Sequence, residues 1–487
     1  MSMMLSELLP DLDISPDLTV TGLCDDSRKV RPGDVFLAYS GETTDGKRYV
    51  ADAITQGAVA VLADEKTQHP GVPGYVVPGL RKRIGKLADS YFGMPSAHMI
   101  VIAVTGTNGK TSFTHLMAQA LGSRNQKAGI VGTMGYGLPG SLIEPGLTTP
   151  PALELQRRLS ELQQSGCAAV VLEASSHGLA QDRLSGIRIH TAVLTNITHD
   201  HLDYHGSFAA YRQAKQRLFE MEGLQTAIVN LDDPSAAEIM GAARDGARCV
   251  TYSLHGEADV SVTGLELSGS GIAMTCRLPD GLISVQAKLF GAFNAENILA
   301  VVATLVSMGW SHEEICDGVA SLTPVAGRMD IIETPGMPIV VVDYAHTPDA
   351  LEKSLGAIRQ HFAGRQLVCV FGCGGDRDRS KRPMMGEIAA RLADRIYVTS
   401  DNPRSEDPQA ILEEICRGMP ADADYVLEAD RGRAVRQAVE TAACEDVVLV
   451  AGKGHETYQE LATGRIAFSD YDEARAALDV KINGQGS

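Results

Sequence analysis

The feature that most constrains this chain is a loop that joins an apolar run to a stretch suited to a helix. Residues 105–111 read Thr-Gly-Thr-Asn-Gly-Lys-Thr. They follow the apolar residues 99–104 and precede a helix that we expect to begin near Ser112. A buried strand, a glycine-rich loop and a helix in this order are typical of an α/β domain with a mainly parallel sheet.

The loop has the composition of a phosphate-binding loop. Gly106 and Gly109 allow backbone conformations and close contacts that a side chain forbids, so amides and the helix start can converge on a polyphosphate. Lys110 supplies a cation, and the hydroxyl of Thr111 suits a magnesium ligand, so we expect a nucleoside triphosphate. Val104 stands where the common G-x-x-x-x-G-K-[ST] spacing has its first glycine. This departure counts against a generic kinase and leaves an ordinary glycine-rich turn as the alternative.

Length and charge limit the class of protein. The 487 residues exceed a single hydrophobic core and suggest about three domains. The net charge of −18 disfavours nucleic-acid binding, because affinity for phosphate backbones comes mostly from clustered Lys and Arg. The nine cysteines have no paired C-x-x-C spacing and predict reduced thiols. The N-terminus lacks a leader pattern and no run reaches the ~20 apolar residues of a membrane span, so we expect a soluble cytoplasmic protein without a membrane partner.

Turn signals and alternating apolar runs divide the chain into three α/β domains. Breaks at residues 93–96 and 323–329 separate them. Strand-like runs alternate with helix-compatible segments, as βαβ units do, at residues 168–172, 191–194, 226–229, 338–342, 367–371, 396–398 and 447–450. We predict a small N-terminal α/β domain at residues 1–92, a central parallel-sheet domain at 93–326 and a C-terminal α/β domain at 327–487.

Polar residues follow two of the predicted central strands. Glu173 ends an apolar run, so its carboxylate is expected at the carboxyl edge of the sheet, where a metal-binding role and a turn-capping role fit equally. The next strand leads into a histidine-rich loop, in which His201 is our candidate ligand and a surface histidine is the alternative. Lys215 lies on an amphipathic helix, where the residues alone favour a solvated lysine.

Together these motifs resemble the Mur ligase family, the ATP-dependent amide-forming enzymes of peptidoglycan precursor synthesis. The likeness covers nearly the whole chain: the phosphate loop, then residues 173–178, 200–203, 214–215, 294–297, 327–328, 343–346 and 452–456. Residues 374–378 and the Asp-Asn-Pro-Arg motif at 401–404 resemble the branch that adds the third amino acid, meso-2,6-diaminopimelate. The resemblance implies an N-terminal UDP-muramoyl-binding domain, a central phosphate-loop ATPase domain and a C-terminal Rossmann-like domain that binds the amino acid.

The resemblance also implies the catalytic groups, which are Lys110, Glu173, His201 and Lys215. Lys215 would carry a carbamate derived from CO₂ (N6-carboxylysine), a carboxylate-like metal ligand. With Glu173 and His201 it would hold one Mg²⁺, while Thr111 and the triphosphate would hold another. The ATP contacts implied in the same way are Gly106, Thr107, Asn108, Gly109, Lys110, Thr111, Asn297, Arg328, Asp343 and His346.

Substrate contacts carry over position by position. UDP-N-acetylmuramoyl-L-alanyl-D-glutamate is expected at Ser27, Glu42, Thr43, Thr44, Thr148, Thr149, Ser175, Gln181 and Arg183. Leu147 stands where the family often has Asn, so a side-chain contact there is in doubt. The incoming diaminopimelate is expected at Arg377, Asp401, Asn402, Pro403, Arg404, Gly452 and Glu456.

Arg404 carries the prediction of specificity. Diaminopimelate has a distal carboxylate that lysine lacks, and a guanidinium can bind it through two parallel hydrogen bonds. Lysine would leave a buried Arg404 unpaired, which disfavours it strongly. The alternative is an exposed arginine in the turn after Pro403.

We therefore predict a monomeric ligase that activates the D-glutamyl side-chain carboxylate as an acyl phosphate and releases ADP and phosphate as the amide forms. Such chemistry needs positioning, charge stabilisation and exclusion of water, which three domains closing over one cleft would provide. The alternatives are an L-lysine-adding Mur ligase, a folate-polyglutamating ligase, a phosphate-loop kinase or ATPase, and a nucleotide-binding scaffold.

Overall fold

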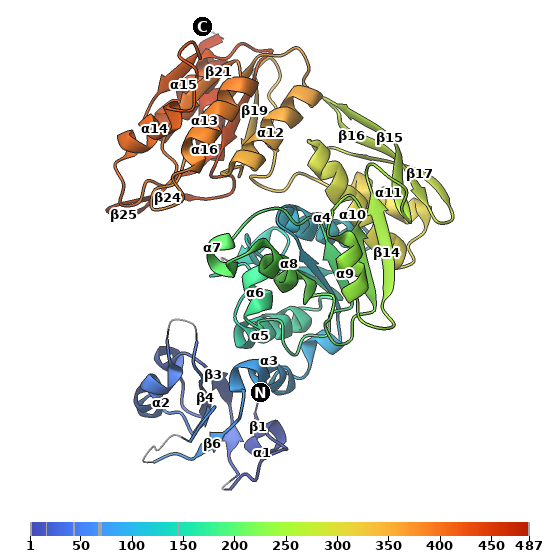
Figure 1. Cartoon of the computed structure of the whole chain (residues 1–487), viewed down its shortest axis with the longest axis vertical. Coiled ribbons are helices and arrows are strands. Elements are labelled where there is room, and N and C mark those ends of the chain that lie inside the picture. The colour runs from blue at the N-terminus through green and yellow to red at the C-terminus, as the bar shows by residue number, and fades with distance from the viewer. Residues whose placement is uncertain (1, 16, 42–43, 67–70, 144–145, 486–487) are drawn as a thin grey trace. The chain divides into compact units, whose positions relative to one another are not determined.

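The structure, a computed structural model, describes residues 2–15, 17–41, 44–66, 71–143 and 146–485 (Figure 1). The chain divides into two units, of which the first comprises Met1–Val260 and Ala300–Trp310 and the second Ser261–Leu299 and Ser311–Ser487. The predicted central domain, residues 93–326, includes parts of both units, and its boundaries stay a prediction. Each unit is described by itself.

The N-terminal part of the first unit has the α/β structure predicted for this region, and its sheet is parallel. Its strands run in the order β3 (Gly22–Cys24), β4 (Asp34–Ala38), β5 (Ala60–Ala63) and β6 (Gly74–Val76), all parallel. An antiparallel pair and three helices accompany it: β1 (Met3–Met4), β2 (Thr19–Val20), α1 (Leu5–Leu8), α2 (Val50–Thr55) and α3 (Leu80–Tyr91). Val35 and Leu62 of the sheet and Ile84 of α3 share one hydrophobic core.

The central sheet positions the candidate site. Its strands in the first unit run in the order β10 (Ser141–Ile143), β9 (Gly135–Leu138), β8 (Ala128–Gly132), β11 (Ala169–Glu173), β7 (Ile100–Thr105), β12 (Thr191–Leu194), β13 (Thr226–Asn230) and β14 (Arg248–Ser253). The strands from β8 to β14 in this order are parallel, because each returns through a crossover. The helices are α4 (Lys110–Ser123), α5 (Ala152–Gln164), α6 (Ser176–Ala180), α7 (Leu202–His205), α8 (Phe208–Gln216) and α9 (Ala236–Ala242). Helix α4 begins at Lys110, two residues before the predicted start.

The second unit begins with an antiparallel meander of β15 (Val260–Ser268), β16 (Gly271–Leu278) and β17 (Gly281–Ala287). Helices α10 (Ala292–Ser307) and α11 (His312–Ala320) follow, and the residues of α10 from Ala300 onward belong to the first unit. A six-stranded sheet then runs in the order β18 (Asp330–Ile332), β19 (Ile339–Asp343), β23 (Val447–Ala451), β20 (Leu367–Phe371), β21 (Arg395–Val398) and β22 (Tyr425–Leu427), parallel except for β18.

Helices cover both faces of this sheet, so its strands are apolar on both sides. One core joins it to α12 (Pro348–His361), α13 (Lys381–Leu392) and α14 (Pro408–Cys416), and another joins it to α15 (Arg431–Thr441) and α16 (Asp470–Gln485) (Figure 1). A hairpin of β24 (Tyr458–Leu461) and β25 (Gly464–Ala467) completes the unit. The prediction of an α/β fold with parallel sheets is confirmed.

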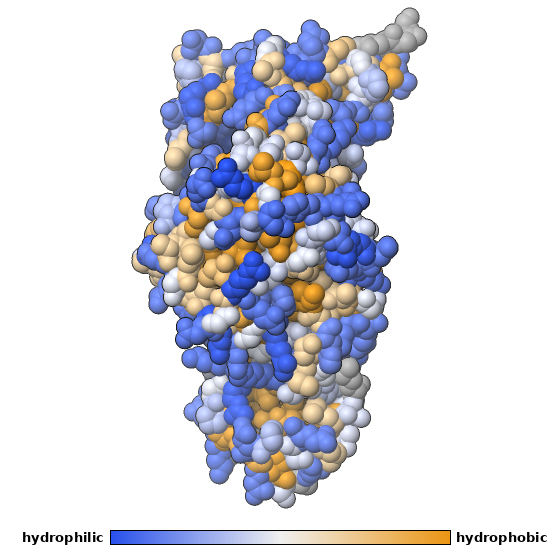
Figure 2. Space-filling model, turned by 90° about the vertical axis from the view of Figure 1, so that its right-hand side faces the viewer, coloured by the Kyte–Doolittle hydropathy of each residue, from blue (hydrophilic) through white to orange (hydrophobic). Residues whose placement is uncertain are grey.

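The surface drawn in Figure 2 is mainly hydrophilic, with smaller hydrophobic patches between the polar residues. In the part of the chain that the structure describes, no helix is both long and apolar enough to cross a membrane. The nine cysteines, all of them in described segments, form no disulfide.

Candidate active site

The polar residues predicted in the first unit meet at the carboxyl edge of the central sheet. Strands β11, β7 and β12 are neighbours, and they end at Glu173, at the phosphate loop and at the histidine-rich loop. In the parallel register Glu173 lies opposite Val104, immediately before the phosphate loop. The fold therefore brings together three segments that are far apart in the sequence.

Glu173 is 1% exposed and is held by two threonines. Its Oε1 accepts hydrogen bonds from Thr111 Oγ1 and from the amide of Thr133, both at 2.9 Å, and its Oε2 accepts one from Thr133 Oγ1 at 3.0 Å. Thr133 Oγ1 also lies 3.1 Å from Thr148 Oγ1. A Cβ on Gly132 would lie 2.3 Å from Oε1, so glycine makes room for the carboxylate. Thr133 was not among the predicted site residues, although it directly follows the apolar run at residues 128–132.

Two lysines meet at one carbonyl of the phosphate loop. Lys110 Nζ donates to the oxygens of Gly106 at 2.8 Å and Thr107 at 2.9 Å, so it folds back on its own loop. Lys215 Nζ donates to the same Gly106 oxygen at 2.6 Å and is 1% exposed. Burial, and then the charge of Lys110, lower the pKa of Lys215 well below its usual value. Lys215 is therefore not the solvated lysine that the helix pattern alone favours.

The phosphate loop differs in one respect from the expectation that its successive amides point toward an anion. The amide of Thr107 donates to Asn196 O at 2.7 Å, and that of Asn108 donates to Asn196 Oδ1 at 2.9 Å. Gly106 must be a glycine here, because a Cβ would lie 1.8 Å from Thr195 Oγ1. Two amides of the loop thus bind protein, which the sequence did not reveal because Asn196 is 88 residues away from Asn108.

His201 lies at the edge of this group. It caps α7 with a positive φ of 50°, its side chain is 49% exposed, and its Nε2 is 3.5 Å from a carboxylate oxygen of Asp200. Its ring centroid is 4.9 Å from that of His177 and 6.3 Å from that of Tyr211. Within the described segments, no three His, Cys, Asp or Glu side chains are grouped as metal ligands. The predicted metal set, which includes a threonine and a modified lysine, stays a prediction.

Residues predicted to bind the acceptor peptide form one connected network. Thr149 Oγ1 donates to Glu173 O at 2.7 Å and lies 2.9 Å from Ser175 Oγ. Arg183 donates from Nη1 to Thr149 O at 2.7 Å and from Nε to Gln181 Oε1 at 3.0 Å. This network adjoins Glu173, so a peptide bound there would lie beside the phosphate loop.

The remaining acceptor contacts are less well defined. Ser27 is buried at the start of a 3₁₀ turn, and Thr44 is exposed. Glu42 and Thr43 lie outside the described residues. Leu147, at the position where the family often has Asn, is 48% exposed.

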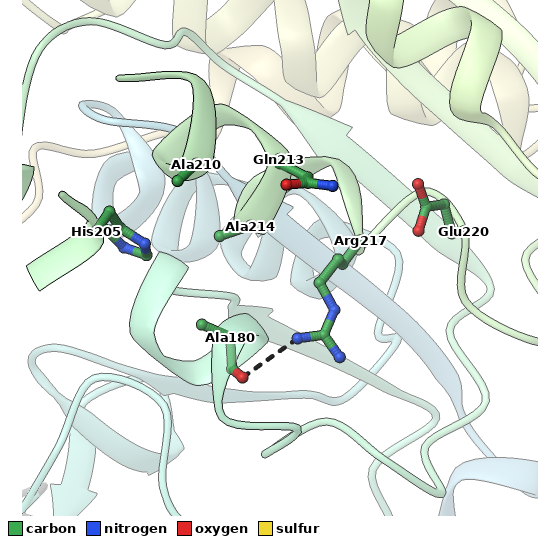
Figure 3. Close-up of a pocket in the computed structure, with 7 residues that line it drawn as sticks. All are labelled: Ala180, His205, Ala210, Gln213, Ala214, Arg217 and Glu220. Carbon is green, nitrogen blue, oxygen red and sulfur yellow. Dashed lines mark hydrogen bonds between the residues drawn. The ribbon is translucent and has the colours of Figure 1, made fainter. Parts of the chain in front are cut away.

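A pocket of about 380 Å³ lies between α6 and α8 (Figure 3). In it, Arg217 reaches across to donate a hydrogen bond to Ala180 O at 3.2 Å. The pocket contains no residue of the phosphate loop, and its lining consists of Ala180, His205, Ala210, Gln213, Ala214, Arg217 and Glu220.

In the second unit the predicted residues gather at another carboxyl edge. They follow four parallel neighbours in the sheet: β19, β23, β20 and β21. This is the edge at which open α/β sheets bind ligands. The residues concerned are Asp343, His346, Arg377, Asp401, Asn402, Pro403, Arg404, Gly452 and Glu456.

Asn402 and Glu456 are held by a buried lysine. Lys453 is 0% exposed, and its Nζ donates to Glu456 Oε2 at 2.7 Å and to Asn402 Oδ1 at 3.1 Å. Asn402 Oδ1 also accepts from the amide of Glu460 at 2.8 Å, so its Nδ2 is turned toward Glu456 Oε2, 3.0 Å away. An amide donor and a carboxylate therefore lie side by side, an arrangement suited to the carboxylate and ammonium of an amino acid.

The expectation that Arg404 is buried, and that lysine would leave it unpaired, is corrected by the structure. Its side chain is 24% exposed, and its Nε donates to Glu460 Oε2 at 3.0 Å. Its Nη1 donates to Gly375 O at 2.8 Å. Because Glu460 pairs with Arg404, a ligand without the distal carboxylate does not leave the guanidinium unpaired. The expected free-energy penalty for binding lysine is therefore smaller than the sequence predicted. Arg377 is exposed.

Two glycines bring the predicted nucleotide and amino-acid segments into backbone contact. A Cβ on Gly327 would lie 2.1 Å from the nitrogen of His455, and one on Gly454 would lie 2.7 Å from Gly327 O. Arg328, the next residue, places its guanidinium 4.5 Å from the ring centroid of Tyr344. Its Nε is buried and has no hydrogen-bond partner among the described residues, whereas most buried polar groups have one.

Other predicted nucleotide residues are anchored locally. Asp343 accepts from Ser354 Oγ at 2.9 Å, and burial raises its pKa. His346 Nδ1 lies 2.8 Å from the main-chain oxygen two residues before it. Asn297 is 4% exposed and donates to Asn294 Oδ1 at 3.1 Å.

Behind the amino-acid residues lies a fully buried ion pair. Arg431 donates through Nε and Nη2 to the carboxylate of Asp470, at 2.7 Å each, and both side chains are 0% exposed. The same guanidinium donates to Ser400 O at 3.1 Å and to Ala451 O at 2.9 Å. These carbonyls precede the two segments predicted to bind diaminopimelate.

Comparison with known proteins assigns the chain to a family. Three family models match it: "Mur ligase family, catalytic domain" at residues 19–91, "Mur ligase middle domain" at 104–305 and "Mur ligase, glutamate ligase domain" at 327–454. The UDP-N-acetylmuramoyl-L-alanyl-D-glutamate--2,6-diaminopimelate ligase of Alkalilimnicola ehrlichii is 48% identical over 483 residues, 96% of each chain. The chain belongs to the Mur ligase family. The protein of the same name from Pseudomonas putida is 44% identical over 98% of each chain.

Solved structures agree with this assignment. A UDP-N-acetylmuramoyl-L-alanyl-D-glutamate--2,6-diaminopimelate ligase superimposes with a TM-score of 0.76 at 36% identity, over 99% of both chains. The fold is also that of MurF ligase from Thermotoga maritima in complex with ADP, with a TM-score of 0.64 at 19% identity over 95% of this chain and 98% of the other. The predicted family, the three-domain Mur ligase architecture and the enzyme class, a ligase, are confirmed.

Proposed function

We propose that this chain is a monomeric cytoplasmic ligase that uses ATP to join meso-2,6-diaminopimelate to the D-glutamyl side-chain carboxylate of UDP-N-acetylmuramoyl-L-alanyl-D-glutamate. The observation that carries the proposal is the grouping of Asn402 and Glu456, which are hydrogen-bonded to each other, with Arg404, which is joined to Asn402 through Glu460. A guanidinium, an amide and a carboxylate match the carboxylate and ammonium carried by the distal carbon of diaminopimelate. The names of the full-length relatives support the same activity.

The start of α4 is the proposed place of the triphosphate, because a helix N-terminus offers amides and a positive dipole to an anion. Lys110 would turn from the carbonyl of Gly106 toward the phosphates. Arg328, Asp343, His346 and Asn297 stay proposed nucleotide residues, and the buried, partnerless Nε of Arg328 supports a ligand there.

The residues of the first unit suit a magnesium ion and a carbamate. The hydroxyl of Thr111 donates a hydrogen bond to Glu173, so the lone pairs of its oxygen stay available to a hard cation. Glu173 itself supplies a carboxylate. Burial favours the neutral amine of Lys215, the form that adds to CO₂, and the resulting carboxylate could serve as a ligand beside Glu173 and His201. Mg²⁺ bound by these groups would offset charge on the phosphates.

The chain's own residues would then guide two transfers. The network around Thr149 and Arg183 would hold the peptide so that the D-glutamyl carboxylate attacks the γ-phosphorus, forming an acyl phosphate and ADP. Asn402, Arg404 and Glu456 would hold the distal end of diaminopimelate. The other amine, once deprotonated, would attack the acyl carbon, and phosphate would leave as the amide forms.

The test is phosphate release by the purified protein with ATP, Mg²⁺ and the UDP-muramoyl dipeptide, comparing meso-diaminopimelate with L-lysine. Release that depends on diaminopimelate alone supports the proposal. Release with lysine alone identifies a lysine-adding ligase, and no release with either amine refutes the ligase assignment. Release that needs no amine identifies an ATPase. Light scattering on the eluted protein tests the monomer.

The carbamate has its own test. Lys215→Ala should lose activity and regain part of it with a small carboxylic acid that fills the gap. Lys353→Ala, which removes an exposed lysine of α12, is the control and should behave as wild type. Full activity of Lys215→Ala without any additive contradicts the carbamate role.

A further inference from the structure

The first half of the phosphate loop is bonded to the segment that follows β12. The main-chain oxygen of Asn196 accepts a hydrogen bond from the amide of Thr107 at 2.7 Å, and its Oδ1 accepts one from the amide of Asn108 at 2.9 Å. Its Nδ2 lies 3.3 Å from Asn108 O, which also accepts a 2.6 Å bond from Thr195 Oγ1. Both peptide groups that flank Asn108 are thus fixed by the protein itself.

The hydroxyl of Thr107 identifies a second anchor. A hydroxyl has one proton to donate and two acceptor sites. Thr107 Oγ1 donates to Thr198 O at 3.1 Å and accepts from the amide of Thr198 at 2.9 Å. The remaining contact, 3.0 Å to the hydroxyl of Tyr211, therefore has Tyr211 as its donor. Tyr211 is 1% exposed, so water does not compete for this bond.

Tyr211 and Lys215 are four residues apart and lie on one face of α8. Lys215 Nζ is 4.6 Å from the ring centroid of Tyr211 and donates to Gly106 O at 2.6 Å. One face of this helix therefore contacts two consecutive loop residues, Gly106 through the unmodified lysine and Thr107 through the tyrosine, and only the tyrosine contact is independent of carbamylation.

We propose that Tyr211 and Asn196 are positioning residues that preset the phosphate loop for the triphosphate, without contacting the nucleotide. The proposal rests on the proposed use of ATP. A glycine-containing loop that had to order on binding would lose conformational entropy at that moment, whereas a loop fixed in advance does not. The two residues therefore act on the affinity for ATP and leave the affinity for the other two substrates alone.

The test compares Tyr211→Phe, Thr107→Val and the double variant. Loss of one buried hydrogen bond should raise KM for ATP about 5-fold, while KM for the dipeptide and for diaminopimelate stays at the wild-type value. Since Tyr211 acts through Thr107, the double variant should be no worse than Thr107→Val alone. Tyr397→Phe is a matched control, because it removes a buried tyrosine bond of the same 3.0 Å length, to Thr441 Oγ1, in the second unit. Its KM for ATP should not change.

Asn196→Asp is an independent test. It keeps the oxygen that accepts from the Asn108 amide, but it replaces the Nδ2 donor with a second oxygen, which faces the oxygen of Asn108. It should raise KM for ATP about 10-fold. An unchanged KM for ATP in Tyr211→Phe or in Asn196→Asp overturns the proposal. So does a double variant in which the two losses multiply, or a parallel rise in all three KM values with a matching loss of stability.

A wild type that releases no phosphate would refute the proposed function and not this inference. The affinity for a non-hydrolysable ATP analogue is then the readout. The same 5-fold weakening in Tyr211→Phe is expected, and equal affinity overturns the positioning role.

Discussion

Replacing Arg431 by methionine tests the buried ion pair between α15 and α16. The guanidinium makes two 2.7 Å bonds to Asp470 and one each to Ser400 O and Ala451 O. Methionine fills much of the same space but leaves the carboxylate of Asp470 buried without its cation. Removing one partner of a buried pair costs about 3–5 kcal/mol. Combining Arg431→Met with Asp470→Leu should recover most of this loss, because no uncompensated charge remains.

Two probes separate the units in this experiment. Trp310 is the chain's single tryptophan and belongs to the first unit, so its fluorescence reports the unfolding of that unit. Far-UV circular dichroism reports the unfolding of both units. In urea, Arg431→Met should show an early circular-dichroism transition while the fluorescence midpoint of Trp310 stays in place. A loss below about 1 kcal/mol would refute the reasoning, as would an equal shift of the Trp310 transition or a double variant no more stable than the single one.

Three further predictions follow from particular contacts. Gly132→Ala should lower kcat about 100-fold, because its Cβ would lie 2.3 Å from Glu173 Oε1 and displace the carboxylate; near-wild-type phosphate release would contradict this. Arg404→Ala should raise KM for diaminopimelate about 100-fold with KM for ATP unchanged, as steady-state kinetics will show. A hydrogen bond from Arg382 lowers the pKa of Glu406 from 4.5 to about 2. This stabilisation is complete above the unfolded-state pKa and is lost as the pH falls from about 4.5 to 2. Glu406→Gln should therefore make the urea midpoint depend less steeply on pH in that window. A slope equal to that of the wild type would contradict this prediction.

The sequence predicted those parts of the site that are encoded locally. The placement of the phosphate loop and Glu173 at one sheet edge was predictable because each stands at the end of an apolar strand, and parallel strands bring such ends together. The partners of these residues were not found, because they are contacts over long separations: Asn196 lies 88 residues from Asn108, and Glu460 lies 56 from Arg404. The role of Arg404 was predicted from chemistry, but its pairing with Glu460 depends on where the β24–β25 hairpin folds back.

The backbone contact between Gly327 and Gly454 has a consequence for how substrates communicate. Arg328 and Glu456, a proposed nucleotide residue and a proposed amino-acid residue, extend from main-chain segments too close together to admit even a methyl group between them. A shift of either segment displaces the other. If a nucleotide at Arg328 raises the affinity of the site at Glu456 for the amino acid, thermodynamic reciprocity requires the amino acid to raise the affinity for the nucleotide by the same factor.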